Sequence, residues 1–433
     1  MVFSEVVISF GHTTQIDYVL AYPQAPIERE IYMEIPRGMR VKGGKREDYV
    51  LKLHRNIYGQ KQAGRVWYKY LSSKLTNEVG FQKSKVDEGV FYRGRVMYVL
   101  YTDDSILAAP TKKEVDDAIS DIQKAGLNIT VEGDVNDFLG VNINKKKDGE
   151  MEMTQPHLIK QIRDDMGFDF KTKSKNLPAC SSKILKRHQE SEEFDKSFNY
   201  RSTVGKLNYL EKATRPDISY ATHQCARFVE NPKVEHAKAI RQIARYLVGT
   251  KDKGTSFKID KTKGLEVFVD SDFAGSWDKN DSLNSDTARS RHGYFITYNG
   301  VPLLWKSQLQ HEIALSTTEA EYTALSYSLR EAIPIINLLQ EMKNLKFNVS
   351  DEIAKIHCKV FEDNSGAIEI AKEDKYRPRT KHLNCRLHHF RTYVESGAIS
   401  IHKIDTYHQP ADLLTKPLNQ EDFCRHRLTM MGW

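Results

Sequence analysis

The chain of 433 residues exceeds the size at which a single hydrophobic core stops growing, about 250 to 300 residues, so the sequence predicts two or three domains. The 65 Lys and Arg residues against 58 Asp and Glu residues give a formal net charge of +7, which permits a polyanionic partner without demanding one. The five cysteines lie far apart and no apolar run approaches the length of a bilayer span, so composition excludes a zinc ribbon, a disulfide framework and a membrane partner.

The first part of the sequence, up to about residue 150, alternates short β-branched and aromatic runs with helical patterns, as mixed α/β layers do. Residues 90–92, 96–101 and 106–109 are expected to form adjacent strands, with residues 102–105 as the tight turn of the second hairpin. A further apolar strand is expected at residues 16–22. This pattern places carboxylates at a hairpin tip and inside another strand.

The remainder of the sequence predicts a linker, a helical region and a second α/β domain. Residues 171–197 are rich in Lys, Ser and Glu, which is typical of an exposed connection. Residues 200–249 carry apolar side chains at helical spacing, so we expect a small helical domain. From residue 265 onward the expected order is a strand, strands near 293–305, a helix from Thr317, a strand at 356–361 and more helix, which indicates a sheet flanked by helices.

The carboxylates of the first part are candidates for a metal site. Asp103 and Asp104 lie between strongly apolar strands and Asp17 lies inside one, where charge is costly unless something compensates it. An isolated Asp pair in a hairpin is more simply explained as turn residues, but the third carboxylate favours divalent ions of the kind that promote nucleotidyl transfer. Because side chains alternate along a strand, Asp103 and Asp104 point in different directions, and we expect Asp17 and Asp103 to be the main ligands.

Four ordered motifs in this region resemble those of copia-type reverse transcriptases: residues 15–26 (QIDYVLAYPQAP), 30–38 (EIYMEIPRG), 57–68 (IYGQKQAGRVWY) and 101–104 (YTDD). The resemblance implies a polymerase palm in which Asp17, Asp103 and Asp104 hold the catalytic metals. It also implies that Tyr22 excludes a ribose 2′-OH and that Gln62 lines the nucleotide pocket, although Tyr22 without its motif would be interpreted as a core aromatic. The match continues through residues 137–140 (DFLG), 200–205 (YRSTVG), 214–220 (TRPDISY) and 245–250 (RYLVGT), which resemble the end of the palm and the thumb or connection region.

A second set of carboxylates occupies the last part of the sequence. Asp270 and Asp272 lie two residues apart in an expected strand, so they share a face and invite a cation. In the helix expected from residue 317, Glu319 completes a capping box with Ser316 and therefore has a structural explanation. Glu321 has none, which makes it the better catalytic candidate.

Asp363 follows an expected strand and Asp412 begins an expected helix, so each is also explained as a turn or helix-start residue. Together with Asp270 and Glu321, however, they follow the D-E-D-D order of a ribonuclease H. The strings that resemble the copia type are residues 270–275 (DSDFAG), 316–322 (STTEAEY), 362–368 (EDNSGAI), 380–391 (TKHLNCRLHHFR) and 411–417 (ADLLTKP). The resemblance implies two Mg²⁺ ions per active site, with Mn²⁺ as a substitute, and a water that attacks the RNA strand of an RNA/DNA hybrid.

Basic and histidine side chains near this second set are further candidates. Contacts with the nucleic-acid backbone are expected from Lys381, His382, Arg386 and Arg391, although a solvated basic face explains these residues equally well. His408 lies four residues before Asp412 and is a candidate helper in proton transfer, but a lone histidine more often has a structural role.

As a whole, the resemblance implies a multidomain fold of the α+β and α/β classes. Its parts are a reverse transcriptase palm at residues 1–150, thumb or connection helices at 151–260 and a ribonuclease H-like α/β domain at 261–433. The implied partners are an RNA template, a DNA primer, an RNA–DNA hybrid and dNTPs. The implied locations are cytoplasmic virus-like particles or the nucleus.

The resemblance does not extend in front of Gln15, and only 16 residues precede Asp17. We therefore expect an N-terminally truncated copia-type Pol polyprotein that lacks most of the fingers. Polymerase activity should suffer, because the charge of the incoming triphosphate would lack its basic contacts. Two alternatives stay open: that only the ribonuclease H is active, or that the chain is a catalytically dead relic that binds nucleic acid.

Overall fold

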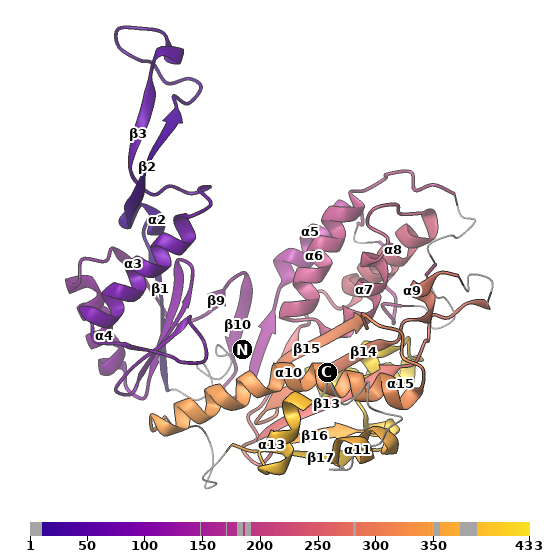
Figure 1. Cartoon of the computed structure of the whole chain (residues 1–433). Helices are drawn as coiled ribbons and strands as arrows, with labels where there is room; N and C mark the ends of the chain where they lie inside the picture. Colours follow the sequence, from indigo (N-terminus) through magenta and orange to yellow (C-terminus); the bar gives the residue numbers. More distant parts are fainter. Residues whose placement is uncertain are drawn as a thin grey trace. The chain divides into compact units, whose positions relative to one another are not determined.

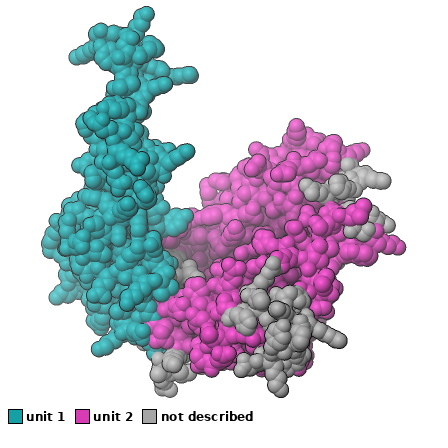
Figure 2. All heavy atoms as spheres, in the orientation of Figure 1, with its two compact units in different colours: residues 1–135, 341–349 teal, residues 136–340, 350–433 magenta. Residues whose placement is uncertain are grey.

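The computed structural model describes residues 11–147, 149–169, 171–179, 185–186, 192–279, 283–347, 349, 356–372 and 388–433 (Figure 1). Lys381, His382 and Arg386, the expected backbone contacts, lie outside these residues. The chain forms two compact units, Met1–Val135 with Glu341–Val349 and Asn136–Gln340 with Ser350–Trp433 (Figure 2). No helix among the described residues is both long and apolar enough to cross a bilayer.

The first unit is built on a six-stranded antiparallel sheet with the strand order β4-β5-β6-β7-β1-β8. Its strands are β1 (His12–Tyr18), β4 (Gln82–Lys83), β5 (Val90–Arg93), β6 (Val96–Tyr101), β7 (Asp104–Ala109) and β8 (Ile129–Gly133). The strands predicted at residues 90–92, 96–101 and 106–109 are confirmed. The predicted turn is shorter than expected, since Asp104 is already the first residue of β7.

Two helices, α3 (Ala63–Asn77) and α4 (Lys112–Lys124), supply the rest of the core of this unit. Side chains two apart in β1, Ile16 and Tyr18, are both buried in that core, as the period of a strand requires. A short helix and a hairpin with a 3-10 turn complete the unit: α2 (Ala21–Gln24), β2 (Pro26–Glu34), η1 (Arg46–Asp48) and β3 (Val50–Arg55).

The second unit begins with a four-stranded sheet of order β12-β11-β10-β9. Its strands are β9 (Asp137–Phe138), β10 (Val141–Lys145), β11 (Met151–Thr154) and β12 (Thr255–Phe257). The boundary predicted at residue 150 passes through this sheet. The helices that follow are α5 (Pro156–Asp165), α6 (Tyr200–Ala213), η2 (Pro216–Ile218), α7 (Ser219–Ala226) and α8 (Val234–Gly249), so the helical region predicted at 200–249 is confirmed.

A five-stranded sheet of order β15-β14-β13-β16-β17 forms the rest of the second unit. Its strands are β13 (Leu265–Asp272), β14 (Arg291–Tyr298), β15 (Val301–Leu309), β16 (Cys358–Glu362) and β17 (Ile399–Lys403). The central strand β13 is antiparallel to β14 and parallel to β16. Consecutive strands therefore pair on one side of β13, and strands that return after helices pair on the other, so the sheet is mixed.

Helices accompany this sheet throughout the second unit (Figure 1). They are α9 (Ser285–Ala288), α10 (Thr317–Asn344), α11 (Ser365–Lys372), η5 (His388–Phe390), α13 (Arg391–Glu395), η6 (Thr406–His408), α14 (Asp412–Thr415) and α15 (Gln420–Met431). Helix α10 begins at Thr317 and α14 begins at Asp412, as predicted. The multidomain α/β fold class predicted from the sequence is confirmed.

Candidate active site

The central strand β13 carries a buried carboxylate close to its end. Asp270 is 3% exposed and lies directly opposite Gly293 of β14. Burial raises the pKa of Asp270, because a carboxylate is costly to keep charged away from water. Asp272 follows on the same strand, and its pKa is raised by burial and by Asp270, so the two carboxylates interact as their spacing predicted.

Helix α10 adds a second carboxylate. The predicted capping box is present in modified form: Ser316 Oγ accepts from the Glu319 N–H at 3.2 Å, while the Glu319 carboxylate accepts from the Leu315 N–H at 2.8 Å. Glu321, past the cap, is 5% exposed. Burial, reinforced by Asp270 and further carboxylates, raises the pKa of Glu321 to about 12.

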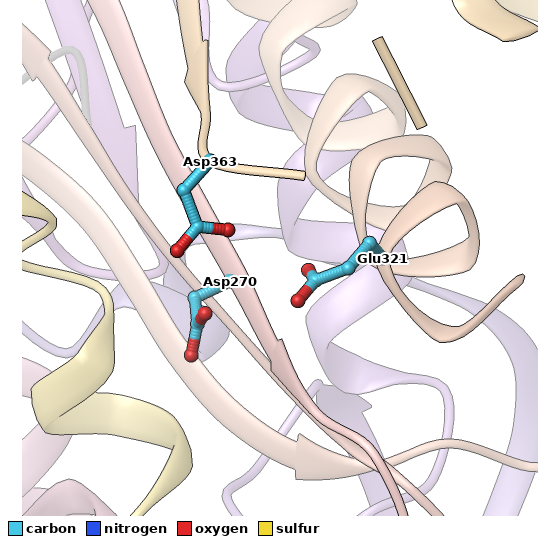
Figure 3. A group of neighbouring side chains, drawn as sticks. All are labelled: Asp270, Glu321 and Asp363. Atoms are coloured by element: carbon cyan, nitrogen blue, oxygen red, sulfur yellow. The ribbon is translucent and has the colours of Figure 1, made fainter. Parts of the chain in front are cut away.

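The third carboxylate comes from the end of β16, which runs parallel to β13. Parallel pairing brings the carboxyl ends of both strands to one edge of the sheet, so Asp363, one residue past β16, lies near Asp270. Oxygen atoms of Asp270, Glu321 and Asp363 all lie within 4.8 Å of one another. Figure 3 shows the three side chains pointing toward a common space.

Two more acidic side chains border this space, of which one was predicted and one was missed. Asp412 was predicted. Its pKa is raised to about 8, mainly by burial and further by the charge of Asp270. Glu362 was missed, although it is 0% exposed and burial raises its pKa well above the usual range. The signal for Glu362 was its position two residues after Val360, which places both on the buried face of β16. We call Asp270, Glu321, Glu362, Asp363 and Asp412 the acidic cluster.

Helix α14 closes against the sheet because β14 has a glycine at the contact. A Cβ atom at Gly293 would lie 2.7 Å from Leu414 Cβ and 2.9 Å from Thr415 Cγ2, which is closer than such atoms approach. The absence of a side chain there lets Thr415 donate a hydrogen bond to the Asp270 carboxylate. Gln409, fully buried, donates to the Val269 carbonyl at 2.8 Å and so fastens the segment before α14 to β13.

The other residues predicted near this set lie at its margin. Arg391 is half-buried at the start of α13. His408 is exposed in η6, with its ring edge-on to Tyr407 at 5.1 Å between centroids. Its neighbour Thr406 donates from its hydroxyl to Asp363 Oδ2 at 2.7 Å. A role for His408 in proton transfer stays a prediction.

The carboxylates predicted for the first unit also converge. Asp17 of β1 lies directly opposite Asp104 of β7, and the Tyr18 N–H donates to the Asp103 carbonyl at 3.1 Å. Burial raises the pKa of Asp17, and the charge of Asp103 raises it further. Among the described residues, however, the three aspartates do not bring three ligand oxygens within 4.8 Å, as the acidic cluster does. Their assignment as metal ligands stays a prediction.

The hairpin turn that carries Asp103 is held by a hydrogen bond from a core side chain. Thr102 has a positive φ of 60°, a backbone conformation that costs energy for a residue with a side chain. Its carbonyl accepts a hydrogen bond from Trp67 Nε1 at 2.6 Å, and Trp67 is 1% exposed in the core. The buried indole therefore fixes the turn conformation that positions Asp103.

The predicted nucleotide-binding residues, Tyr22 and Gln62, lie in α2 and at the start of α3. The half-buried Tyr22 ring packs on Tyr58 at 4.5 Å between centroids. The pKa of Tyr58 is raised by burial and by the charge of Asp103, so this aromatic pair is close to the carboxylates. Gln62 is the half-buried N-cap residue of α3. Their contacts with a nucleotide stay predictions.

Comparison with known proteins agrees with this arrangement. Residues 9–179 match the family described as reverse transcriptase (RNA-dependent DNA polymerase). The retrovirus-related Pol polyprotein from transposon TNT 1-94 of Nicotiana tabacum is 31% identical over 430 residues, covering 96% of this chain and 31% of the relative. The corresponding protein from transposon RE2 of Arabidopsis thaliana is 32% identical over 414 residues, covering 94% of this chain and 27% of the relative.

The chain is similar to the Pol polyproteins of copia-type transposons over almost all of its length. It spans less than a third of the length of these two relatives. A solved structure of LC11-RNase H1 in complex with an RNA/DNA hybrid matches 35% of this chain and 93% of its own at 16% identity, with a TM-score of 0.24. That score is too low to support an argument.

Proposed function

We propose that the second unit of this chain hydrolyses the RNA strand of RNA/DNA hybrids, with divalent cations held by Asp270, Glu321, Asp363 and Asp412. The observation that carries the proposal is the convergence of carboxylate oxygens of Asp270, Glu321 and Asp363, the first two of them buried, within 4.8 Å of one another. Carboxylates crowded in this way repel each other and disfavour their charged forms, unless a cation joins them.

The residues present fit such cations. Glu321 Oε2 and Glu362 Oε2 are buried and have no hydrogen-bond partner among the described residues. A buried acceptor without a donor is costly, and a hard oxygen-seeking cation such as Mg²⁺ or Mn²⁺ satisfies it. When bound, paired divalent ions make water a stronger nucleophile and stabilise the leaving oxygen of a phosphodiester.

The protein's own contribution is to hold the carboxylates in place. The Thr415 hydroxyl donates to Asp270, and the Thr406 hydroxyl donates to Asp363 at 2.7 Å. The Asn364 N–H donates to Glu362 Oε1 at 3.0 Å. Each hydrogen bond occupies one oxygen lone pair, fixes the rotation of the carboxylate and leaves other lone pairs directed at the shared space.

The proposal is tested with one RNA strand in three forms: paired with DNA, paired with RNA and single-stranded. The purified chain is incubated with each in Mg²⁺, in Mn²⁺ or in EDTA, and the products are separated by size. We expect cleavage of the hybrid alone, and only with a divalent ion. Tight binding that weakens steeply with salt, without any cleavage, would instead indicate a protein that only binds nucleic acid.

A second function, RNA-directed DNA polymerisation, is proposed for the first unit. It is favoured by the match of residues 9–179 to reverse transcriptases and by the convergence of Asp17, Asp103 and Asp104 at one end of the sheet. Extension of a DNA primer on an RNA template with dNTPs and Mg²⁺ tests it. Asp103→Asn should abolish extension and leave hybrid cleavage unchanged; extension that persists in this variant would refute the assignment of Asp103.

A further inference from the structure

In the part of the chain that the structure describes, one ammonium group contacts the acidic cluster, at Asp412. Lys416 follows α14, four residues after Asp412, and its Nζ lies 2.8 Å from Asp412 Oδ1. The side chain of Asp412 is 7% exposed and that of Lys416 is 35% exposed. The lysine side chain is therefore the more solvent-exposed partner of the pair, so its ammonium group can move from the buried carboxylate into solvent.

The charge of Lys416 acts on more than its nearest partner. It opposes the upward pKa shifts of Asp270, Glu321 and Asp412 alike. In return, burial disfavours the charged ammonium group, but Asp270 and Asp412 outweigh burial and raise the pKa of Lys416. Opposite charges that are partly shielded from water attract strongly, so this single cation offsets repulsion across the acidic cluster.

An ion pair between a lysine and a carboxylate is often only a surface feature, and the chain provides a more exposed pair for comparison, whose partners are 41 residues apart in the sequence. Lys206 Nζ lies 2.6 Å from Asp165 Oδ2, with side chains 27% and 36% exposed. Its lysine is about as exposed as Lys416, but its carboxylate is much more exposed than Asp412. The difference between the two sites is therefore the set of buried carboxylates around Lys416, and not the lysine itself.

We propose that Lys416 is a built-in counter-cation of the acidic cluster, which occupies part of the space of a divalent cation and competes with it for Asp270 and Asp412. The inference depends on the proposed function, since it assumes that the acidic cluster holds divalent ions. Lys416 would stabilise the metal-free protein and lower the apparent affinity for metal. Displacement of the ammonium group from the carboxylates would therefore limit both the rate and the affinity of metal binding.

The test replaces Lys416 by methionine, which keeps the length of the side chain and removes its charge, with Lys206→Met as the matched control. Mn²⁺ binding to the full chain is measured at about pH 8 by calorimetry and by the electron paramagnetic resonance signal of free Mn²⁺. Thermal unfolding is measured in EDTA and with Mn²⁺. Asp270→Asn shows whether the Mn²⁺ that is measured occupies the acidic cluster.

We expect Lys416→Met to bind Mn²⁺ about tenfold more tightly than the wild type, because a competing positive charge is gone. In EDTA this variant should unfold at a lower temperature than the wild type, and Mn²⁺ should restore more of its stability than in the wild type. Lys206→Met should change neither quantity.

Two contrary results are distinguishable. If Asp270→Asn abolishes Mn²⁺ binding while Lys416→Met binds as the wild type does, the metal site is real and the competition is refuted. If no Mn²⁺ binds, or if Asp270→Asn binds Mn²⁺ as tightly as the wild type does, the proposed metal site is wrong and so is the role of Lys416. Unchanged stability of Lys416→Met in EDTA would also overturn the role as a counter-cation.

Discussion

Thr415 donates a hydrogen bond from its hydroxyl to the carboxylate of Asp270, 145 residues away in the sequence, and both side chains are buried. Thr415→Val keeps the shape of the side chain and removes the donor. Loss of a hydrogen bond that orients a metal-holding carboxylate typically costs 10- to 100-fold, so we expect hybrid cleavage to slow by about that factor. The rate is measured at saturating Mg²⁺ and compared with Thr429→Val, which removes a hydroxyl on α15. Equal rates for the two variants would refute the role of the Thr415 hydroxyl in orienting Asp270.

Gly293 provides a second test of how α14 is held against β14. Gly293→Ala places a methyl group 2.7 Å from Leu414 Cβ, so α14 must move away from the sheet. Overpacking of this kind costs about 1 to 3 kcal/mol, and the displaced Asp412 and Thr415 should lower hybrid cleavage as well. Urea denaturation measures the first effect and the cleavage rate measures the second. Gly264→Ala is unsuitable as a control because Gly264 has a positive φ of 62°, whereas Gly205→Ala in α6 meets open space. Wild-type stability and cleavage in Gly293→Ala would contradict the close approach.

The sequence predicted the acidic residues that stand at recognisable places in their elements. Asp270 and Asp272 share a strand face, and Glu321 lies past a capping box that explains Glu319. Asp412 begins a helix after a proline. In each case the local pattern determined both the element and the direction of the side chain.

Long-range contacts could not be predicted in this way. Glu362 was missed because a carboxylate at a strand end looks like a solvated turn, and its full burial depends on elements far away in the chain. The donation from Gln409 to the Val269 carbonyl, at 2.8 Å, likewise depends on chain packing that no local pattern encodes. The boundary at residue 150 followed from the resemblance, which does not show that β10 and β11 pair across that position.

The pH dependence of stability follows from Asp412. Burial, and to a smaller extent the charge of Asp270, raise the pKa of Asp412 in the folded chain to about 8, from its ordinary value of 3.8. Between these two values the folded state binds more protons than the unfolded state, so the free energy of unfolding falls as the pH rises. At about 1.4 kcal/mol per pKa unit, the loss across the whole interval is on the order of several kcal/mol.

Urea denaturation in EDTA at about pH 5 and about pH 8 measures this loss. Asp412→Asn removes the titrating group, so its stability should fall less than that of the wild type between the two pH values. An identical fall in both proteins would show that Asp412 titrates normally.

A buried ion pair in the helical part of the second unit predicts a large loss of stability. Arg215 Nη2 lies 2.8 Å from Asp217 Oδ2, both side chains are 0% exposed, and the Tyr246 hydroxyl donates to the same carboxylate at 2.6 Å. Asp217→Ala leaves the Arg215 charge buried without its partner and should cost about 3 to 5 kcal/mol. Asp165→Ala, in the exposed pair with Lys206, should cost about 1 kcal/mol or less. Similar losses in the two variants, measured by urea denaturation, would contradict this interpretation.

The central claim is that the acidic cluster is the hydrolytic site. Its most direct test is the rate of Mg²⁺-dependent cleavage of an RNA/DNA hybrid by Asp270→Asn, with Asp103→Asn as a control that removes a carboxylate from the first unit. Asp270→Asn should lose about two to three orders of magnitude in rate, while Asp103→Asn should cleave as the wild type does. Cleavage by Asp270→Asn at the wild-type rate would contradict the claim.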